Sequence, residues 1–341
     1  MTTRMFAEAA QSSAVVAHQQ AANHDVLARL ADDLRTMPPH VAMTAARGSS
    51  DHAATYLKHL IETRVGVLVA SAAPSVASIY RADVMAETLL AIGVSQSGKS
   101  PDLLATMERA KHMGARTLAL VNTIDSPLAE MVDTVLPLHA GAETSVAATK
   151  SFIATLAASL SLMAAWSGAA DLADDAAALP DLLAQAWTSD WSPLVEALQH
   201  ARGLYVIGRG PGFGAAQELA LKLKETCGLH AEAFSAAEVR HGPMALIGPD
   251  LPLIVLRQQD ESAAATDDLI VDALASGATV LVASDHDVAP GAIRLPLPRA
   301  TPLVAPILAV QAFYRAANRL SLARGFDPDT PPLLRKVTET V

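Results

Sequence analysis

The stretch Gly93-Val-Ser-Gln-Ser-Gly-Lys-Ser100 decides how the rest of the chain is interpreted. The apolar run 88–92 before it indicates a buried strand, and residues 101–111 after it have the spacing of an amphipathic helix with Pro101 in its first turn. A strand, a hydroxyl-rich turn and a helix N-terminus in this order favour an anion site, because free backbone N–H groups and the helix dipole both attract negative charge. Three serines add hydrogen-bond donors: Ser95, Ser97 and Ser100.

The same stretch permits two interpretations. It matches the P-loop pattern G-x-x-x-x-G-K-[ST], in which Lys99 would contact the β- and γ-phosphates of a nucleotide and Ser100 would hold magnesium. It also fits a compact turn that binds a single phosphate monoester, such as a sugar phosphate. A P-loop enzyme places a magnesium-binding aspartate after a nearby apolar strand, and Asp125 and Asp285 both fit that position poorly. ATP hydrolysis is therefore the less favoured interpretation.

Composition narrows the classes of protein and of partner. The chain has 341 residues, of which 51% are hydrophobic, and its net charge is −10 without a basic stripe, so no nucleic-acid partner is expected. Cys227 is the sole cysteine, which excludes a disulfide within the chain. The start of the sequence lacks a signal-peptide pattern. Residues 152–170 are apolar but rich in Ala and Ser, which indicates a buried or interface helix; we expect no membrane contact and a cytoplasmic protein.

Short apolar runs alternate with helical patterns along most of the chain. After a helical segment that ends at Pro38, this alternation predicts an α/β fold with parallel, doubly wound sheets. The expected strands are 41–45, 65–71, 88–92, 117–121 and 132–138 in the first half, and 204–207, 252–256 and 279–283 in the second.

The two halves of the sequence resemble each other. Adding 163 to a residue number takes Gly114-Ala115 to Gly277-Ala278 and Leu90 to Leu253. This offset predicts an internal duplication, with two flavodoxin-like lobes of three layers each, αβα. The counterpart of the serine turn, residues 257–261, has lost the serines and gained Asp260 and Glu261, which would repel a phosphate. We therefore expect phosphate binding in the first lobe alone.

Candidate acid–base residues lie in the second half. Lys222 and Glu225 are three residues apart on a predicted helix, so they share a face, and His241 follows in a His-Gly-Pro turn. Glu225 and His241 fit an acid–base pair. The alternatives are an ordinary helix ion pair for Lys222 and Glu225, and a hydrogen-bonded loop histidine for His241.

Taken together, these motifs resemble the sugar isomerase (SIS) family. The pattern is closest to the isomerase part of glucosamine-6-phosphate synthase and to the stand-alone SIS-type glucosamine-6-phosphate deaminases. The matching stretches occur in family order: Gly48-Ser-Ser50, Ser95-Gln-Ser-Gly98, Val146-Ala-Ala-Thr-Lys150, Ala220-Leu-Lys-Leu-Lys-Glu225, His230-Ala-Glu-Ala233, His241-Gly-Pro243 and Lys336.

The resemblance implies a role for each matching residue. Glu225 would move a proton between C1 and C2 of the open-chain sugar, and Lys222 would stand beside it. His241 would open the sugar ring in the site of a neighbouring subunit, which implies a homodimer, and Lys336 would contact the carbonyl region of the substrate. The remaining matches would bind the phosphate (Ser95, Gln96, Ser97 and Ser100) or line the sugar site (Ser50 and Val146). The resemblance implies no metal and no organic cofactor.

The resemblance also implies a domain layout. A helical segment would span 1–37, a phosphate-binding lobe 38–185, a lobe with the catalytic glutamate and histidine 186–330, and a tail over the active site 331–341. The synthase has an N-terminal glutaminase with a cysteine nucleophile, whereas this sequence begins Met1-Thr-Thr3, so we expect no glutamine hydrolysis.

The expected reaction is then the release of ammonia: glucosamine 6-phosphate and water give fructose 6-phosphate and ammonia. Three departures from the family pattern leave the exact sugar open: Arg47, Lys99 and Ala148. The alternatives are a deaminase or deglycase for another amino-sugar phosphate and a non-catalytic sensor of phosphosugars.

Overall fold

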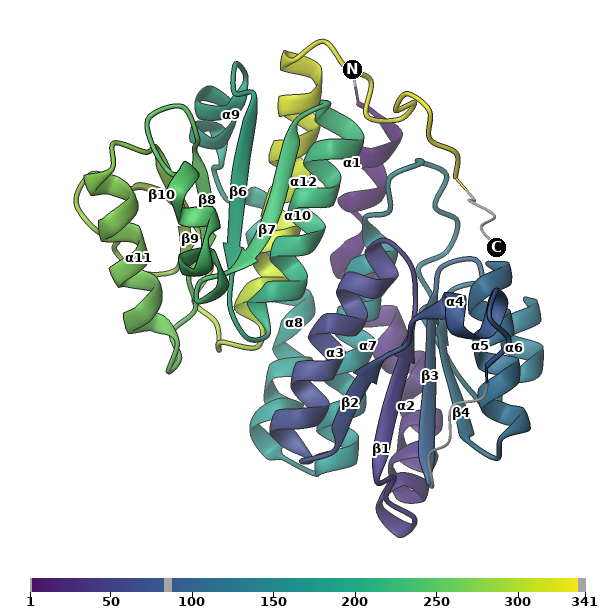
Figure 1. The fold of residues 1–341 in the computed structure, drawn as a ribbon. Coiled ribbons are helices and arrows are strands. Elements are labelled where there is room, and N and C mark those ends of the chain that lie inside the picture. Colours follow the sequence, from purple (N-terminus) through teal and green to yellow (C-terminus); the bar gives the residue numbers. More distant parts are fainter. Residues whose placement is uncertain (1, 83–87, 337–341) are drawn as a thin grey trace. The chain divides into compact units, whose positions relative to one another are not determined.

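The computed structural model describes residues 2–82 and 88–336, which form two compact units (Figure 1). The first unit comprises Ala14–Glu143, Lys150–Ala178 and Arg335–Val341. The second unit comprises Met1–Ser13, Thr144–Thr149 and Leu179–Leu334. The chain thus enters each unit more than once, and each unit contains one parallel sheet.

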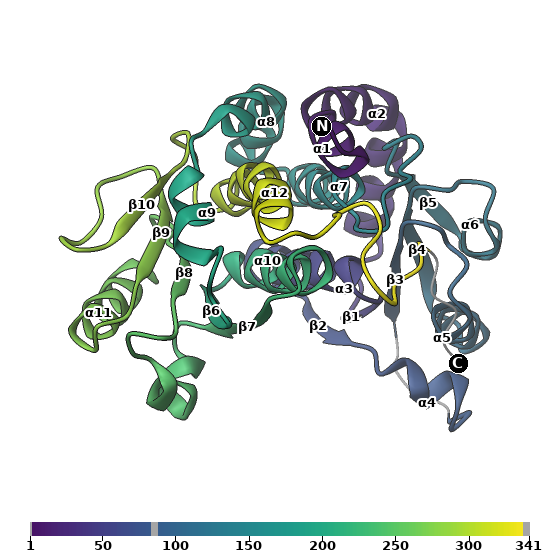
Figure 2. The same ribbon diagram turned by 90° about the horizontal axis from the view of Figure 1, so that it is seen from above.

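The sheet of the first unit has the strand order β2-β1-β3-β4-β5, and all neighbouring strands are parallel. This is the flavodoxin-like doubly wound order. Helices α3 and α7 lie on one face of the sheet, and α5 and α6 lie on the other (Figure 2). The elements are α2 (Ser12–Thr36), β1 (Val41–Ala45), α3 (Ser49–Arg64), β2 (Leu68–Ser71), α4 (Pro74–Ser78), β3 (Leu89–Ser95), α5 (Pro101–His112), β4 (Arg116–Val121), α6 (Pro127–Met131), β5 (Thr134–Pro137), α7 (Lys150–Ser167) and α8 (Ala170–Thr188), which continues into the second unit.

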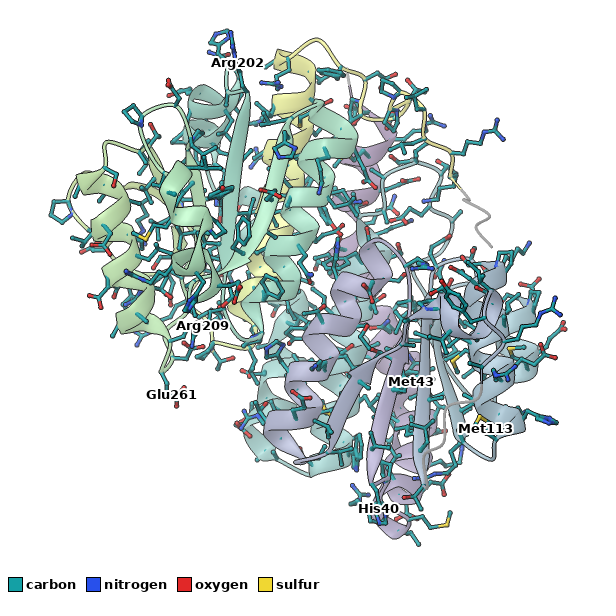
Figure 3. All side chains as sticks on the ribbon, viewed as in Figure 1. His40, Met43, Met113, Arg202, Arg209 and Glu261 are labelled. Carbon is teal, nitrogen blue, oxygen red and sulfur yellow. The ribbon has the colours of Figure 1, made fainter. Side chains whose placement is uncertain are left out.

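The sheet of the second unit repeats this order as β7-β6-β8-β9-β10, again with every pair parallel. Arg202 and Arg209 mark the two ends of β6, and Glu261 lies at the same end as Arg209, where the strands finish (Figure 3). The elements are α1 (Arg4–Ala9), α9 (Ser192–Leu198), β6 (Gly203–Gly208), α10 (Gly212–Cys227), β7 (His230–Ser235), the 3₁₀ turns η1 (Glu238–His241) and η2 (Pro243–Leu246), β8 (Leu253–Leu256), α11 (Ala263–Ala275), β9 (Val280–Ser284), β10 (Ile293–Pro296) and α12 (Ala305–Ala323).

The duplicated α/β fold expected from the sequence is confirmed. The offset of 163 takes α3 from Ser49–Arg64 to Gly212–Cys227, which are the bounds of α10, and it takes α5 to within one residue of α11. Strands β7 and β10 and helix α12 were missed by the sequence patterns. The two strands lie at the edges of the sheet, where partial burial leaves no continuous apolar run.

Close packing fixes the position of the serine turn. Every residue of β3 is buried, and a Cβ on Gly93 would lie 3.3 Å from side-chain atoms of Met107 and Leu128. Side chains of α5 and α6 therefore approach β3 closely, and a larger residue at 93 would force Met107 and Leu128 to shift. Helix α7 is buried along most of its length, as the Ala- and Ser-rich pattern of 152–170 predicts. Among the described residues, no helix is both long and apolar enough to span a bilayer.

Candidate functional site

The serine turn of the first unit is held in one conformation by its own hydrogen bonds. The Gly98 N–H donates to Ser95 Oγ over 2.9 Å, and the Gln96 carbonyl accepts the Thr123 N–H over 3.2 Å. Gly98 has φ +66°, and a Cβ there would lie 2.1 Å from Ser126 Oγ, so glycine is required. Ser97 and Ser100 follow on this rigid loop, and the Ser100 side chain makes no capping bond to α5.

The geometry of the turn favours the compact anion site over the P-loop. Strand β3 continues through Ser95, so the first half of the Gly93–Ser100 pattern is extended strand rather than loop. Lys99 is exposed, and Lys99 and Ser100 both precede the helix, which begins at Pro101. A loop of this length surrounds one phosphate group more readily than the chain of phosphates in a nucleotide.

Ser50 lies at the same edge of the sheet as the serine turn. It is in the first turn of α3, directly after β1, and β1 pairs with β3 in a register that aligns Ala45 with Gly93. The strand order reverses between β1 and β3, and doubly wound sheets bind their ligands in the crevice at this switch point. The structure therefore brings Ser50 and the serine turn to one edge of the first unit.

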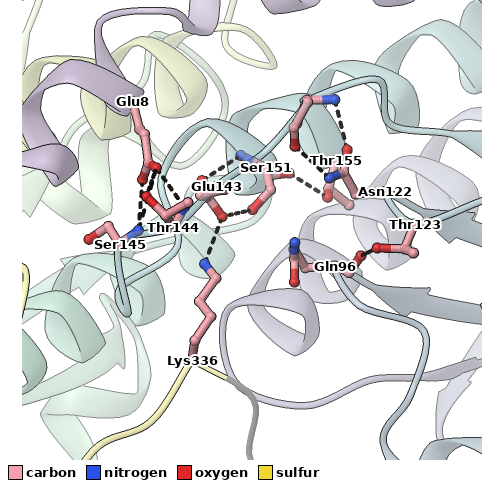
Figure 4. A network of polar contacts seen from close by, with 12 residues as sticks. Glu8, Gln96, Asn122, Thr123, Glu143, Thr144, Ser145, Ser151, Thr155 and Lys336 are labelled. Atoms are coloured by element: carbon pink, nitrogen blue, oxygen red, sulfur yellow. Dashed lines mark hydrogen bonds and ion pairs between the residues drawn. The ribbon is translucent and has the colours of Figure 1, made fainter.

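Lys336 lies in the first unit, where it forms an ion pair with Glu143 (Figure 4). The sequence patterns did not identify Glu143 as a site residue. The Glu143 carboxylate is fully buried and accepts the Ser151 N–H over 3.1 Å, the Ser151 hydroxyl over 2.6 Å and the Lys336 ammonium over 3.3 Å. The sequence did contain a signal for Glu143. It is an acidic residue seven positions before Lys150, where α7 begins, and helix N-termini attract carboxylates.

Val146 lies in the second unit, on a loop held by Glu8 of α1. The Glu8 carboxylate is 7% exposed and accepts the Thr144 N–H over 2.6 Å, the Thr144 hydroxyl over 2.9 Å and the Ser145 N–H over 3.1 Å (Figure 4). Val146 itself is half-buried. A residue near the start of the chain therefore determines the conformation of the loop that carries Val146.

Lys222 and Glu225 meet on α10 in a cluster of four residues. The Lys222 ammonium lies 2.5 Å from a Glu225 oxygen and 3.4 Å from a Glu218 oxygen, and the Tyr314 hydroxyl donates to Glu218 over 3.0 Å. The side chains of Lys222 and Glu218 are 1% and 0% exposed, whereas that of Glu225 is 21% exposed. This is a buried network and not the exposed helix pair that spacing alone would also allow.

The cluster keeps a positive charge beside an accessible carboxylate. Burial alone would lower the pKa of Lys222, but the charges of Glu218 and Glu225 and their hydrogen bonds outweigh it, so the pKa of this lysine lies above its usual value of 10.5. Lys222 is therefore an ammonium at neutral pH. Glu225 can accept a proton from a bound molecule while the ammonium stabilises negative charge that develops nearby.

His241 stands apart from this cluster. It ends the exposed turn η1 and precedes Gly242, whose φ of +138° only glycine adopts readily. In the described part of the chain, no hydrogen bond joins His241 to Glu225. Their pairing in one active site stays a prediction.

The described residues contain no cluster suited to a metal ion: no three His, Cys, Asp or Glu side chains come together. Cys227 is buried at the end of α10, and burial raises the pKa of its thiol to about 11. A thiol with such a pKa is not a nucleophile at neutral pH.

Comparisons with known proteins identify the family. The SIS domain model matches twice, at residues 39–165 and 197–316. The glutamine–fructose-6-phosphate aminotransferase (isomerizing) of Symbiobacterium thermophilum is 36% identical over 312 residues, which are 87% of this chain and 51% of that protein. This chain thus spans about half the length of the curated relatives it matches.

Comparison with solved structures agrees with the SIS domain match. A protein of Silicibacter pomeroyi DSS-3, provisionally named a phosphosugar isomerase, is 37% identical with a TM-score of 0.91, over 96% of this chain and 100% of that one. Glucosamine-6-phosphate deaminase of Thermotoga maritima shares the fold, with a TM-score of 0.79 at 21% identity, over 99% and 100% of the two chains. With two matched domains and two sheets of the same strand order, the chain belongs to the SIS domain family.

Proposed function

We propose that this chain is an aldose–ketose isomerising deaminase that converts glucosamine 6-phosphate and water into fructose 6-phosphate and ammonia. The observation that carries the proposal is the network on α10, where the buried ammonium of Lys222 is bonded to the partly exposed carboxylate of Glu225. A proton next to a carbonyl is removed most easily by a carboxylate with a cation beside it, because the cation stabilises the enolate that forms.

In the proposed reaction the serine turn binds the phosphate through Ser95, Gln96, Ser97 and Ser100. Ser50 and Val146 contact the sugar, and His241 of a neighbouring copy in a homodimer opens the ring.

The proton transfer then proceeds on the open-chain aldehyde. Glu225 takes the proton from C2, and the electron pair moves towards the aldehyde oxygen near Lys222. A proton passes from the substrate's amino group to that oxygen, and Glu225 returns its own proton to C1. The product is the C2 imine of fructose 6-phosphate. Water adds to C2, ammonia leaves, and the ketose remains. Lys336 contacts the carbonyl region and releases its ion pair with Glu143 to do so.

Water, and not a glutamine-derived nitrogen, is the second reactant in the proposed reaction. The relatives named as aminotransferases are about twice as long as this chain. In the synthase that the sequence resembles, glutamine hydrolysis belongs to a separate domain with a cysteine nucleophile. Cys227, the sole cysteine of these 341 residues, is buried with a raised pKa. The proton transfer itself is common to both directions and needs no cysteine.

A second candidate substrate class is favoured by two positions. Arg47 and Ala148 replace residues that the resemblance associates with sugar hydroxyls, so another amino-sugar phosphate, such as galactosamine 6-phosphate or a fructosamine 6-phosphate, is the alternative. A non-catalytic phosphosugar sensor would not need the buried Glu218–Lys222–Glu225 network.

A direct assay of ammonia release tests the proposal. The purified chain is incubated with glucosamine, galactosamine and fructosamine 6-phosphates, and ammonia and ketose phosphate are measured together. We expect equimolar ammonia and fructose 6-phosphate from glucosamine 6-phosphate. Ammonia from a different sugar would select the second candidate. Saturable sugar-phosphate binding without any ammonia would indicate the sensor.

A further inference from the structure

An ion pair at the base of the serine turn joins the loop after β1 to helix α5 of the first unit. Arg47 follows β1, and its Nε and Nη2 atoms each lie 2.6 Å from the same Asp102 oxygen. Asp102 is in the first turn of α5, two residues after Ser100, and its side chain is 1% exposed. The pair therefore lies at the switch point between β1 and β3.

The buried carboxylate of Asp102 competes with the ligand that the turn is proposed to bind. Its other oxygen accepts the Leu103 N–H over 2.8 Å, so it already uses the positive end of α5. A phosphate dianion at the same helix terminus would meet this negative charge at short range, where little solvent screens it. Neutralising Asp102 is thus a condition for phosphate binding.

We propose that Arg47 is a positioning residue of the phosphate site: its guanidinium neutralises Asp102 and so allows the serine turn to accept a dianion. The inference rests on the proposed function in one respect, namely that the turn binds the phosphate. Arg47 is 52% exposed, so the rest of its guanidinium stays in water while two of its nitrogens hold Asp102.

The surrounding charges support this role. Asp51, in the first turn of α3, is the second carboxylate that faces Arg47. Burial raises the pKa of Asp51, and the positive charges of His52 and Arg47 oppose that rise. Two helix N-termini therefore each carry an acidic residue towards the switch point, and Arg47 stabilises both. Exposed Lys99 adds positive charge to the turn itself.

The test measures affinity for inorganic phosphate and for fructose 6-phosphate by calorimetry, together with thermal unfolding. Arg47→Ala should weaken both affinities by about 10-fold or more, since it removes the positive charge that is paired with a buried carboxylate beside the ligand. The double variant Arg47→Ala/Asp102→Asn should recover affinity to within about 3-fold of the original chain, because the repelling charge has gone. Arg64→Ala, which breaks the exposed Arg64–Asp171 pair of the same unit, is the matched control and should change neither affinity.

Each other outcome overturns the inference. Unchanged affinity in Arg47→Ala would make the pair a surface contact without a role. A loss that Asp102→Asn does not rescue would mean that Arg47 acts by touching the ligand. Should Arg47→Ala fail to fold, Asp102→Asn alone decides: affinity equal to or above the original supports the inference, and reduced affinity contradicts it. If the unaltered chain binds neither phosphate nor sugar phosphate, the proposed function fails first, and the inference fails with it.

Discussion

Helices α3 and α10 occupy the same place in the two halves of the molecule, yet they carry different chemistry. Each follows the first strand of its sheet, and the offset of 163 superimposes their bounds and takes Glu62 to Glu225. The two glutamates are similarly exposed, at 30% and 21%. Glu62 accepts the Val69 N–H over 3.1 Å and so supports β2, whereas Glu225 binds a buried ammonium.

The difference comes from the neighbours and not from the acid. The offset takes His59 to Lys222, and the His59 ring bonds to the carbonyl of Thr55 within its own helix, over 3.0 Å. Lys222 instead lies between two carboxylates at 1% exposure. The proposed proton-transfer site on α10 thus differs from its counterpart on α3 by a cation that is buried beside the acid.

The turns after β3 and β8 differ in the opposite sense: here the first unit carries the proposed ligand site and the second does not. In the second unit, Asp260 occupies the turn and accepts the Ser262 N–H over 2.9 Å, and Arg257 forms a two-pronged pair with Asp267. This turn satisfies its helix N-terminus with its own carboxylate. The serine turn has hydroxyls instead, and the carboxylate at its helix terminus, Asp102, is paired with Arg47.

We expect the largest difference between the two helices when each of the two equivalent glutamates is replaced by glutamine. Glu225→Gln keeps size and hydrogen bonding but cannot accept a proton, so ammonia release should fall by about 10²–10⁴-fold. Sugar-phosphate affinity should stay nearly unchanged, since the serine turn is intact. Glu62→Gln is the matched control and should retain normal turnover. Equal turnover in the two variants would remove Glu225 from the mechanism.

The two lysine–glutamate pairs provide the next largest contrast. Lys222→Met leaves Glu218 as a buried charge without its ammonium, so the free energy of unfolding should fall by about 3–5 kcal/mol. Lys58 pairs with Glu62 over 3.9 Å at 39% exposure, and Lys58→Met should cost no more than about 0.5 kcal/mol. Denaturant unfolding of both variants measures the two values. A small cost for Lys222→Met would show that the buried network contributes little to the fold.

The smallest effect concerns the two turns. The offset takes Ser97 to Asp260, so Ser97→Ala and Asp260→Asn alter equivalent positions. Loss of one hydroxyl that donates to a phosphate should weaken phosphate binding by about 10-fold, because hydrogen bonds to charged groups contribute more than neutral ones. Asp260→Asn should leave that affinity unchanged. Weaker binding in Asp260→Asn alone would move the phosphate to the second unit.

Local patterns predicted much of this molecule, because they depend on neighbouring residues. The strand at 41–45 and the helix start at Pro101 are where the apolar run and the proline indicate them. Tyr314 was missed, since it meets Glu218 from a position 96 residues away. Glu218 lies four residues before Lys222, a spacing that allows an ion pair, but the sequence does not show that the pair is buried. Glu8 and Glu143 were missed because their partners are remote in sequence. Glu8 stabilises the loop at Thr144, and Glu143 pairs with Lys336 of the tail.

The ion pair between Glu143 and Lys336 is one of several interactions that hold the Glu143 carboxylate. At 3.3 Å it is longer than the two contacts that Ser151 makes with the same carboxylate, and those two do not involve the tail. When the lysine departs, the buried anion keeps both Ser151 donors and the helix terminus behind them. On the proposed function, Lys336 can therefore leave Glu143 for the substrate while Ser151 continues to donate to the buried carboxylate.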